Sequence, residues 1–252
     1  MRLPSAFASL RHRNYRLWFA GQTLSMMGTW MQSVAQGWVV YLLTGSTLAL
    51  GTISFAGTIP TLFLMLPAGA IIDRIPRRRL LMITQSGMML LAFTLAGLAA
   101  TNLLQVWHIA VLAALLGVAN SFDAPARHAL AVEMVEDRAD LPNAIALNST
   151  IFNLARVVGP AIGGAVLALV GPAWCFGLNG LSFLAVLFAL GSMRFTAQMA
   201  GAPRAEPLVR QVVDTLGVTA IEQLGVEADD IIATLATLAK ERGDDVIIVT
   251  GD

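Results

Sequence analysis

Six apolar stretches, each long enough to cross a lipid bilayer, constrain this chain more than any other feature of its sequence. A bilayer core about 30 Å thick requires roughly 20 mostly apolar residues per helix. The six stretches cover residues 17–43, 49–72, 79–101, 104–122, 142–170 and 173–193. Over the whole chain 56% of residues are hydrophobic and only 13% are charged, against about a quarter in soluble domains. The sequence therefore predicts an all-α membrane protein with six transmembrane helices.

The arginines at the ends of these stretches predict how the chain is oriented. Three connections contain no charged residue: 44–48, 101–105 and the turn at Gly171-Pro172. The arginines that flank the stretches all lie on the other side, namely Arg2, Arg11, Arg13, Arg16, Arg74, Arg77, Arg78, Arg79, Arg127, Arg138 and Arg194. Because basic residues stay on the cytoplasmic side of a membrane, we expect both termini in the cytoplasm. We also expect an uncleaved first helix, since the first apolar stretch is longer than the core of a signal peptide.

The balance of charge changes sign near residue 203. Residues 1–203 contain twelve Arg, no Lys and six acids, whereas residues 204–252 contain four basic residues and ten acids. Such a change predicts two segments, a six-helix transmembrane part at 1–200 and a short soluble fragment at 204–252. In the fragment, VTAIEQ and DVIIVTGD have the composition of strands and EADDIIATLATLAKERG that of a helix, which predicts β-α-β order. The only cysteine, Cys175, excludes an internal disulfide.

The connection between the second and third stretches reads GAIIDRIPRRRLL, residues 69–81. Its glycine permits close helix contact, its aspartate places a carboxylate at the membrane surface, and its arginines hold the loop in the cytoplasm. A simple topological anchor would contain the same basic residues. The spacing Gly-x-x-x-Asp-Arg-x-x-Arg-Arg resembles the signature loop of the major facilitator superfamily, with Pro76 where that pattern usually has glycine. This resemblance assigns a gating loop to Gly69, Asp73, Arg74, Arg77 and Arg78.

The fifth stretch contains a second pattern, NLARVVGPAIGGAV. Proline removes a backbone donor and glycines allow tight packing and bending, so this stretch is either a pliable element or a kinked packing helix. Gly159-Pro160 followed by Gly163-Gly164 resembles the antiporter motif of drug-exporting members of the same superfamily. The opening LRHRNYRLWFAGQTLSMMGTWMQSVAQGWVVYLLTGSTLALG is similar to the first helix of exporters related to enterobactin and macrolide efflux proteins. The three resemblances together extend over about residues 8–195.

This resemblance implies a fold of twelve helices in two six-helix halves, which rock about a substrate site near the bilayer midplane. The six stretches equal the first half of such a major facilitator fold. The resemblance implies a transporter of the bacterial inner membrane, not an enzyme, that exports a drug-like or siderophore-like small molecule without a cofactor. Its expected partners are the lipid bilayer, a small-molecule substrate and a second six-helix half, and no nucleic acid. Without that half, an inactive chain and a membrane scaffold without transport remain alternatives.

Polar side chains inside the stretches are the candidates for a substrate cavity, because charge within a membrane span is costly. Arg156 lies near the middle of the fifth stretch, with Asn153 and Ser149 at helical spacing on one face. Substrate contact or gating and a structural, hydrogen-bonded role are both open for this face. Gln32 and Gln36 share a face of the first stretch, where hydrogen bonds between helices are the expected role.

Two positions bear on how transport would be driven. Asp123, at the cytoplasmic end of the fourth stretch, is expected to pair with an arginine of residues 74–79. Many proton antiporters of the superfamily have an arginine in the fourth span, four residues before a glycine. In this chain the residue four before Gly117 is Ala113. Proton coupling is therefore implied by the resemblance alone.

The final segment contains acids for which chemistry and resemblance give different interpretations. Glu227, Asp229 and Asp230 open the predicted helix, where negative charge favours the helix dipole. The strings EPL, GVEADDIIATLA and VIIVTGD resemble the middle of the 5′-nuclease domain of bacterial DNA polymerase I. That resemblance makes Glu227, Asp229, Asp230 and Asp252 ligands of a divalent metal, which activates water in that family.

The set of carboxylates is incomplete by comparison with that nuclease family. The family's amino-terminal strand with its own aspartates is missing, as is the Lys-Asp pair expected after Asp252. We therefore expect no DNA cleavage, and interpret the tail as an unrelated fragment joined to half a transporter in a chimeric or truncated chain. The alternative is a metal-dependent 5′-nuclease fragment to which an incidental membrane segment is attached.

Overall fold

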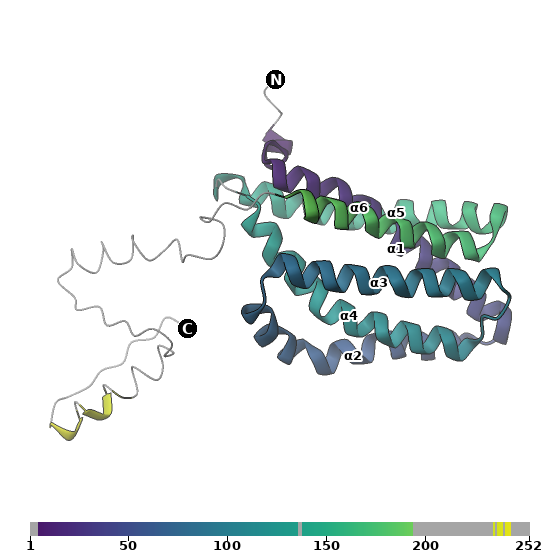
Figure 1. The fold of residues 1–252 in the computed structure, drawn as a ribbon, viewed down its shortest axis with the longest axis horizontal. Helices are drawn as coiled ribbons and strands as arrows, with labels where there is room; N and C mark the ends of the chain where they lie inside the picture. The colour runs from purple at the N-terminus through teal and green to yellow at the C-terminus, as the bar shows by residue number, and fades with distance from the viewer. Residues whose placement is uncertain (1–4, 136–137, 194–233, 235, 239, 243–252) are drawn as a thin grey trace. The chain divides into compact units, whose positions relative to one another are not determined.

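Six long helices form the first of two compact units in this chain, Met1–Met199 and Ala200–Asp252. The computed structural model describes residues 5–135, 138–193, 234, 236–238 and 240–242. The helices of the first unit are α1 (Arg13–Thr44), α2 (Thr47–Arg74), α3 (Arg77–Ala100), α4 (Val106–Glu133), α5 (Leu141–Val170) and α6 (Pro172–Ser192). Two short 3-10 segments accompany them, η1 (Ser5–Arg11) before α1 and η2 (Arg138–Asp140) before α5. Figure 1 shows the six helices running roughly side by side along the long axis of this bundle.

The prediction of an all-helical membrane protein is confirmed, with one difference in the number of spans. All six predicted stretches are helical in the structure. Five of the described helices, α2 to α6, are long and apolar enough to cross a membrane. The exception is α1, which contains the polar side chains of Gln22, Gln32 and Gln36. The fourth helix also continues to Glu133, well past the predicted end at residue 122.

In the second unit the structure describes a few residues of the predicted helix. Residues 234, 236–238 and 240–241 are helical, as expected for part of the stretch 227–243. The two predicted strands, VTAIEQ and DVIIVTGD, lie outside the described residues.

Local sequence explains where several helices begin and end. Gly45 ends α1 in the left-handed region at φ 61°, and its N–H donates to the carbonyl of Tyr41 at 2.8 Å. Glycine adopts this conformation without steric cost. Ser46 then caps α2, where its hydroxyl accepts from the N–H of Ala49 at 3.4 Å. Pro172 occupies the first turn of α6, where a missing backbone donor costs nothing.

The two halves of the helical sequence interleave in the bundle. The closest pairings are α1 with α5 and α6, α2 with α4, and α3 with α4 and α6. Each of the first three helices therefore packs mainly against one or two of the last three. Among the five helices α2 to α6, α2 and α5 have the smallest share of buried residues. Few contacts join α1 to α4, and the cavities described below occupy the space between them.

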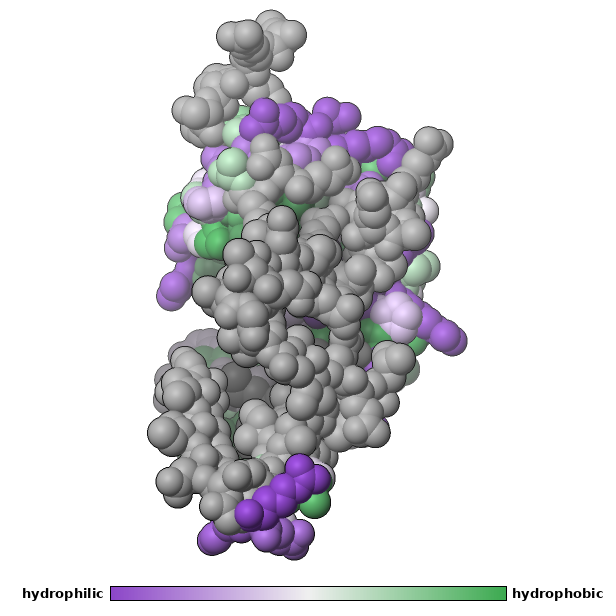
Figure 2. All heavy atoms as spheres, turned by 90° about the vertical axis from the view of Figure 1, so that its left-hand side faces the viewer, coloured by the Kyte–Doolittle hydropathy of each residue, from purple (hydrophilic) through white to green (hydrophobic). Residues whose placement is uncertain are grey.

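Charged side chains gather at the end of the bundle where α1 begins. Arg77 forms an ion pair with Glu133, which joins the start of α3 to the end of α4. At the same end Arg13 donates to the carbonyl of Ser192 and Arg78 to that of Gly191, each at 3.0 Å. Figure 2 views this end, and hydrophilic side chains gather along its rim. Arg13, Arg77 and Arg78, three of the arginines used to predict the cytoplasmic side, thus lie together at one end of the bundle.

The segment before α1 is fastened to the beginning of α5. Asp140 accepts two hydrogen bonds from Arg11, at 2.6 and 2.8 Å, and lies 2.9 Å from Nε2 of His12. The Arg11 and His12 contacts hold the pKa of the Asp140 carboxyl below its usual range. Ser9 donates to the Asp140 carbonyl at 2.8 Å, and the Tyr15 hydroxyl donates to the Ala144 carbonyl at 2.8 Å. These contacts fix the start of α5 against the start of α1.

Candidate functional site

Three cavities follow one another along the face of α1 that looks toward α4. The α2-side cavity measures about 270 Å³ and lies between α1, α2 and α4. The central cavity, about 200 Å³, is lined from α1, α3, α4, α5 and α6. The α5-side chamber, about 660 Å³, lies between α1, α4 and α5. Neighbouring cavities share lining residues: Thr29, Gln32, Leu116 and Asn120 for the first two, and Gln22, Met26, Arg127 and Phe152 for the last two.

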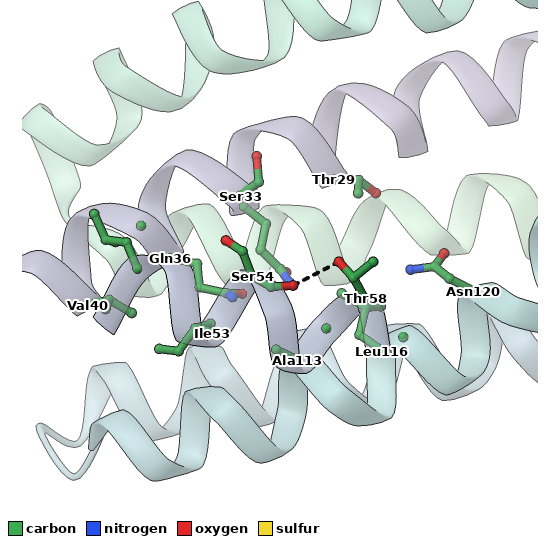
Figure 3. Close-up of a pocket in the computed structure, with 15 residues that line it drawn as sticks. Thr29, Ser33, Gln36, Val40, Ile53, Ser54, Thr58, Ala113, Leu116 and Asn120 are labelled. Atoms are coloured by element: carbon green, nitrogen blue, oxygen red, sulfur yellow. Dashed lines mark hydrogen bonds between the residues drawn. The ribbon is translucent and has the colours of Figure 1, made fainter. Parts of the chain in front are cut away.

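The α2-side cavity combines hydroxyl and amide groups with an apolar wall. Figure 3 shows the polar residues that line it, which are Ser33 and Gln36 on α1, Ser54 and Thr58 on α2, and Asn120 on α4. The Thr58 hydroxyl donates to the carbonyl of Ser54 at 2.9 Å, so this bond lies within α2. The cavity therefore offers hydrogen-bonding groups and carries no charged side chain among its lining residues.

The central cavity contains a buried ion pair held by two further side chains. Asp123 is only 1% exposed, and one of its carboxylate oxygens lies 3.1 Å from the Arg127 guanidinium, one turn further along α4. The other oxygen accepts from the Thr84 hydroxyl at 2.9 Å and from the Gln85 amide at 2.8 Å, both on α3. A buried charge needs such partners, because the cost of removing it from water is otherwise several kcal/mol. The network ties α3 to α4 and fixes the direction of the Arg127 side chain.

Three buried polar atoms around this network lack a protein partner. They are Oε1 of Gln22, Oε1 of Gln85 and Nε of Arg127, and all three residues line the central cavity. Buried polar groups normally have a hydrogen-bond partner in protein or water. Atoms of this kind beside a cavity are the groups that water or a ligand would satisfy.

The α5-side chamber is the largest of the three and differs from the others in charge. Its lining residues include Arg127 and His128 on α4, and none of them is acidic. Trp18 and Phe152 supply aromatic surface, and polar groups come from Gln22, Asn148, Ser149 and Asn153. A largely apolar chamber of a few hundred Å³ with a few polar groups is typical of a small-molecule site.

The structure separates the predicted cavity residues into different places. Gln32 accepts from the Asn179 amide at 2.8 Å, which is the predicted hydrogen bond between helices. Gln36 lines the α2-side cavity, as Figure 3 shows. Ser149 and Asn153 line the α5-side chamber. Arg156 lines none of the three cavities and lies over the Trp30 ring at 5.7 Å from its centroid.

The prediction that Asp123 pairs with an arginine of residues 74–79 is wrong. Asp123 pairs with Arg127 of its own helix, and Arg77 of the 74–79 loop pairs with Glu133 instead. The sequence prediction assigned Arg127 to a cytoplasmic connection, whereas the structure includes it in α4. Sequence reasoning therefore missed Arg127, although an aspartate and an arginine four residues apart are the usual signal of a pair along one helix face.

Other members of the site were also missed. They are Gln22, Ser25, Gln85, Asn120 and Asn179, all polar residues within apolar helices and all lining the central cavity. Their signal was available in the sequence, because a polar side chain in a membrane span is a functional candidate by default.

The glycines of the two sequence motifs differ in how closely another helix approaches them. A Cβ atom added at Gly159 would lie 2.6 Å from Cβ of Trp30, and one at Gly163 would lie 3.0 Å from Cα of Met31. Gly159 and Gly163 therefore allow α5 to pack closely on α1. Added Cβ atoms at Gly164 and at Gly69 would meet nothing within 4 Å in the described part of the chain. The close helix contact expected at Gly69 is thus not made inside this bundle.

Of the remaining predicted site residues, some are described by the structure and others are not. Arg74 ends α2 and is exposed, whereas the Asp73 side chain lies outside the described part. The predicted metal ligands of the tail, Glu227, Asp229, Asp230 and Asp252, also lie outside it. Among the residues that were described, no group of three or more His, Cys, Asp or Glu side chains is placed to hold a metal ion.

A bundle of long apolar helices that encloses cavities lined in part by polar groups defines a multi-pass membrane protein of the transporter class. Over residues 4–224 the sequence matches a major facilitator (MFS) family described as transmembrane secretion effectors. This match covers most of the sequence, and the chain belongs to that family. The resemblance drawn from the sequence motifs is thereby confirmed, and the family is one of transport proteins rather than enzymes.

Two curated relatives are transporters. The staphyloferrin A transporter of Staphylococcus aureus is 29% identical over 177 residues, which are 69% of this chain and 44% of that protein. The multidrug efflux pump Tap of Mycolicibacterium fortuitum is 31% identical over 194 residues, which are 74% of this chain and 46% of that protein. The chain thus spans about half the length of these relatives. No solved structure matches the chain.

The tail has its own similarities. Residues 203–252 match the family described as the 5′-3′ exonuclease amino-terminal, resolvase-like domain. DNA polymerase I of Mycobacterium tuberculosis is 49% identical over 45 residues, which are 18% of this chain and 5% of the polymerase. These matches cover a short segment and confirm the second resemblance for that segment alone.

Proposed function

We propose that residues 1–200 are the amino-terminal half of an exporter that moves a siderophore-like or drug-like small molecule by alternating access. The observation that carries this proposal is the family match over residues 4–224, together with relatives named as a siderophore transporter and a multidrug efflux pump. The cavities along α1 supply the geometry, because exporters of this superfamily bind substrate between two six-helix halves.

The exposed polar face of the bundle supports a second half as partner. Ser149, Asn153 and Arg156 on α5 are all exposed in the bundle, as is Ser54 on α2. Polar side chains within a membrane do not face lipid tails at low cost. A second six-helix half placed against α2 and α5 would cover this face and close the cavities. In this arrangement α1 is the sixth membrane span, its glutamines facing the cavities rather than lipid.

The proposed site residues divide by role. The Arg77 and Arg78 contacts to α4 and α6 support a gating role for the loop of Gly69, Asp73, Arg74, Arg77 and Arg78. The close packing at Gly159 and Gly163 supports a pivot between α5 and α1 in the antiporter-like motif, which also includes Pro160 and Gly164. Substrate contact is assigned to the cavity-lining residues Gln36, Ser149 and Asn153, with Gln32 holding α6 and Arg156 outside the cavities.

Export measurements with and without a second half test this function. The 252-residue chain would be produced in an efflux-deficient bacterium, alone or together with the carboxyl-terminal half of the Tap pump. We expect ethidium export only when both halves are present, at equal membrane abundance of the chain. Absence of export in both cases, with the two halves inserted, would argue against the proposal, and failure of the chain to enter the membrane would reject it.

The tail is proposed to be a nuclease-like fragment without activity. The match at 203–252 favours the alternative function, a metal-dependent 5′-nuclease, but the similarity to DNA polymerase I covers only 5% of that protein. Incubating the purified chain with Mg²⁺ and a flapped DNA should therefore give no cleavage above that of the Asp229→Ala/Asp230→Ala variant. Metal-dependent cleavage lost in that variant would establish the nuclease function instead.

A further inference from the structure

We propose that the α5-side chamber selects amphipathic organic anions and that Arg127 is the residue that binds their carboxylate or sulfonate group. The inference deepens the proposed function, since it names the substrate class of the same site. It rests on how the Asp123–Arg127 pair is oriented between two cavities and on the charge of the chamber lining.

The ion pair presents its positive end to the chamber. Asp123 lines the central cavity only, whereas Arg127 lines both that cavity and the α5-side chamber. The Asp123 carboxylate is 1% exposed. Thr84 and Gln85 stabilise it by donating to the oxygen that Arg127 does not contact. A ligand in the chamber therefore meets the guanidinium and not the carboxylate.

Arg127 keeps donor capacity for a ligand. Its contact with Asp123, at 3.1 Å, uses one terminal nitrogen, and its side chain remains 19% exposed. A guanidinium has five N–H donors in a planar fork that matches the two oxygens of a carboxylate or a sulfonate. Thr84 and Gln85 hold Asp123, and Asp123 holds Arg127, so the fork keeps its direction before a ligand arrives.

The rest of the chamber favours the same chemistry. No acidic residue lines it, so nothing there would pair with a cationic ligand or repel an anion. His128 adds a ring N–H, which donates in either tautomer, and Asn148 adds an amide. Trp18 and Phe152 provide surface for an aromatic or apolar body, and the volume of about 660 Å³ suits a drug-sized molecule.

Two dyes with the same ring system and opposite charge test the inference. The full 252-residue chain in lipid nanodiscs would be titrated into fluorescein, an anion, and into rhodamine 6G, a cation, with fluorescence polarisation as readout. We expect fluorescein to bind at least about tenfold more tightly than rhodamine 6G. Arg127→Gln should weaken fluorescein binding by about tenfold or more and leave rhodamine 6G binding within about twofold, as for loss of a charge-assisted bidentate contact.

Matched variants separate binding from folding. Arg156→Gln removes the same charge from a residue outside the chamber and should leave both affinities unchanged. Because Arg127→Gln leaves Asp123 buried without its partner, the double variant Asp123→Asn/Arg127→Gln removes both charges and should fold. It should lose fluorescein binding like the single variant. Asp123→Asn alone should keep fluorescein binding, since the Arg127 charge remains and the asparagine oxygen can still accept from the guanidinium.

Three outcomes would overturn the inference. Tighter binding of rhodamine 6G that is lost in Asp123→Asn would show a cation site in the central cavity. Equal binding of both dyes, insensitive to every variant, would show partition into lipid. Unchanged fluorescein binding in the double variant would exclude Arg127 as the anion-binding residue. Because the assay needs no transport, a chain that fails to export ethidium but binds fluorescein through Arg127 would contradict the proposed function and not this inference.

Discussion

At the scale of single residues, the interior of this bundle is held together by polar contacts that lipid cannot replace. The bond from Asn179 to Gln32 joins α6 to α1, and both side chains are buried. A buried acceptor left without its donor costs more than the net gain of an ordinary hydrogen bond. These contacts therefore specify which helix faces meet, in a medium where apolar packing alone discriminates weakly.

Asn179→Ala should lower the free energy of unfolding by about 0.5–2 kcal/mol, because Oε1 of Gln32 loses its donor. Unfolding in mixtures of dodecyl maltoside and sodium dodecyl sulfate measures the change. Thr94→Ala is the matched control, since the Thr94 hydroxyl is exposed and donates only within its own helix to Leu90. Equal effects of the two substitutions would contradict a stabilising role for the bond between helices.

The contact of Asp140 with Arg11 and His12 predicts a dependence of stability on pH. Its carboxyl pKa is lowered in the folded chain from an ordinary value of 3.8, so the stabilisation is present above that value. It is lost as the pH falls through the lowered pKa. The difference in stability between the wild type and Asp140→Asn should therefore shrink as the pH falls below about 4. A difference that stays constant down to about pH 3 would contradict this assignment.

Sequence reasoning found some of these residues and missed others for a physical reason. Gln32 was predicted because a glutamine inside an apolar stretch needs a partner. Arg127 was missed because the fourth apolar stretch was ended at its first charge, Asp123. The structure continues the helix because the two charges neutralise each other inside it. Partners on other helices, such as Thr84 and Asn179, cannot be assigned from one sequence, since they depend on which helix faces meet.

At the scale of elements, the glycines of the antiporter-like motif let α5 approach α1. Gly159 and Gly164 lie in the same helix, yet an added Cβ would meet Trp30 at 2.6 Å in the first case and nothing within 4 Å in the second. The sequence predicted a packing or pliable helix here and could not rank its glycines, because the ranking depends on the rotation of α5.

Gly159→Ala should lower thermal stability or membrane abundance by an amount equivalent to about 1–3 kcal/mol, since overpacking forces the helices apart. Gly164→Ala changes the same residue type in the same motif and should be neutral or slightly stabilising. Thermal aggregation of the two variants measured in the same detergent compares them. A larger loss in Gly164→Ala would show that this face of α5 packs against something else.

At the scale of the whole molecule, the sequence predicted the number and order of the six helices in the described bundle, because each apolar stretch has the length a bilayer requires, but it ended α4 eleven residues too early. The pairing of α2 with α4 and of α3 with α6 was not visible in the sequence. Pairing is decided by the shapes of whole helix faces, and apolar composition is nearly uniform across these helices.

The proposed topology puts the connections α1–α2 and α3–α4 outside the cell and the connection α2–α3 inside. Cysteine substitutions at Ser46 and Thr101 should react with a membrane-impermeant maleimide in intact cells, and one at Arg78 should not. Gly171 is a poorer site for this test, because its φ of 88° disfavours any other residue. Cys175 is fully buried and should not contribute background. Labelling of a cysteine at position 78 in intact cells would contradict this topology and indicate the opposite orientation.

The ion pair within α4 also bears on how the protein is made. A charged side chain in a membrane helix is costly during insertion by the translocon, by up to about 2.5–3.5 kcal/mol at the helix centre. Asp123 and Arg127 are one turn apart in a single helix, so they can neutralise each other before α5 and α6 have been synthesised. We therefore expect this part of α4 to leave the translocon with its two charges already paired, without waiting for a later helix to supply a partner.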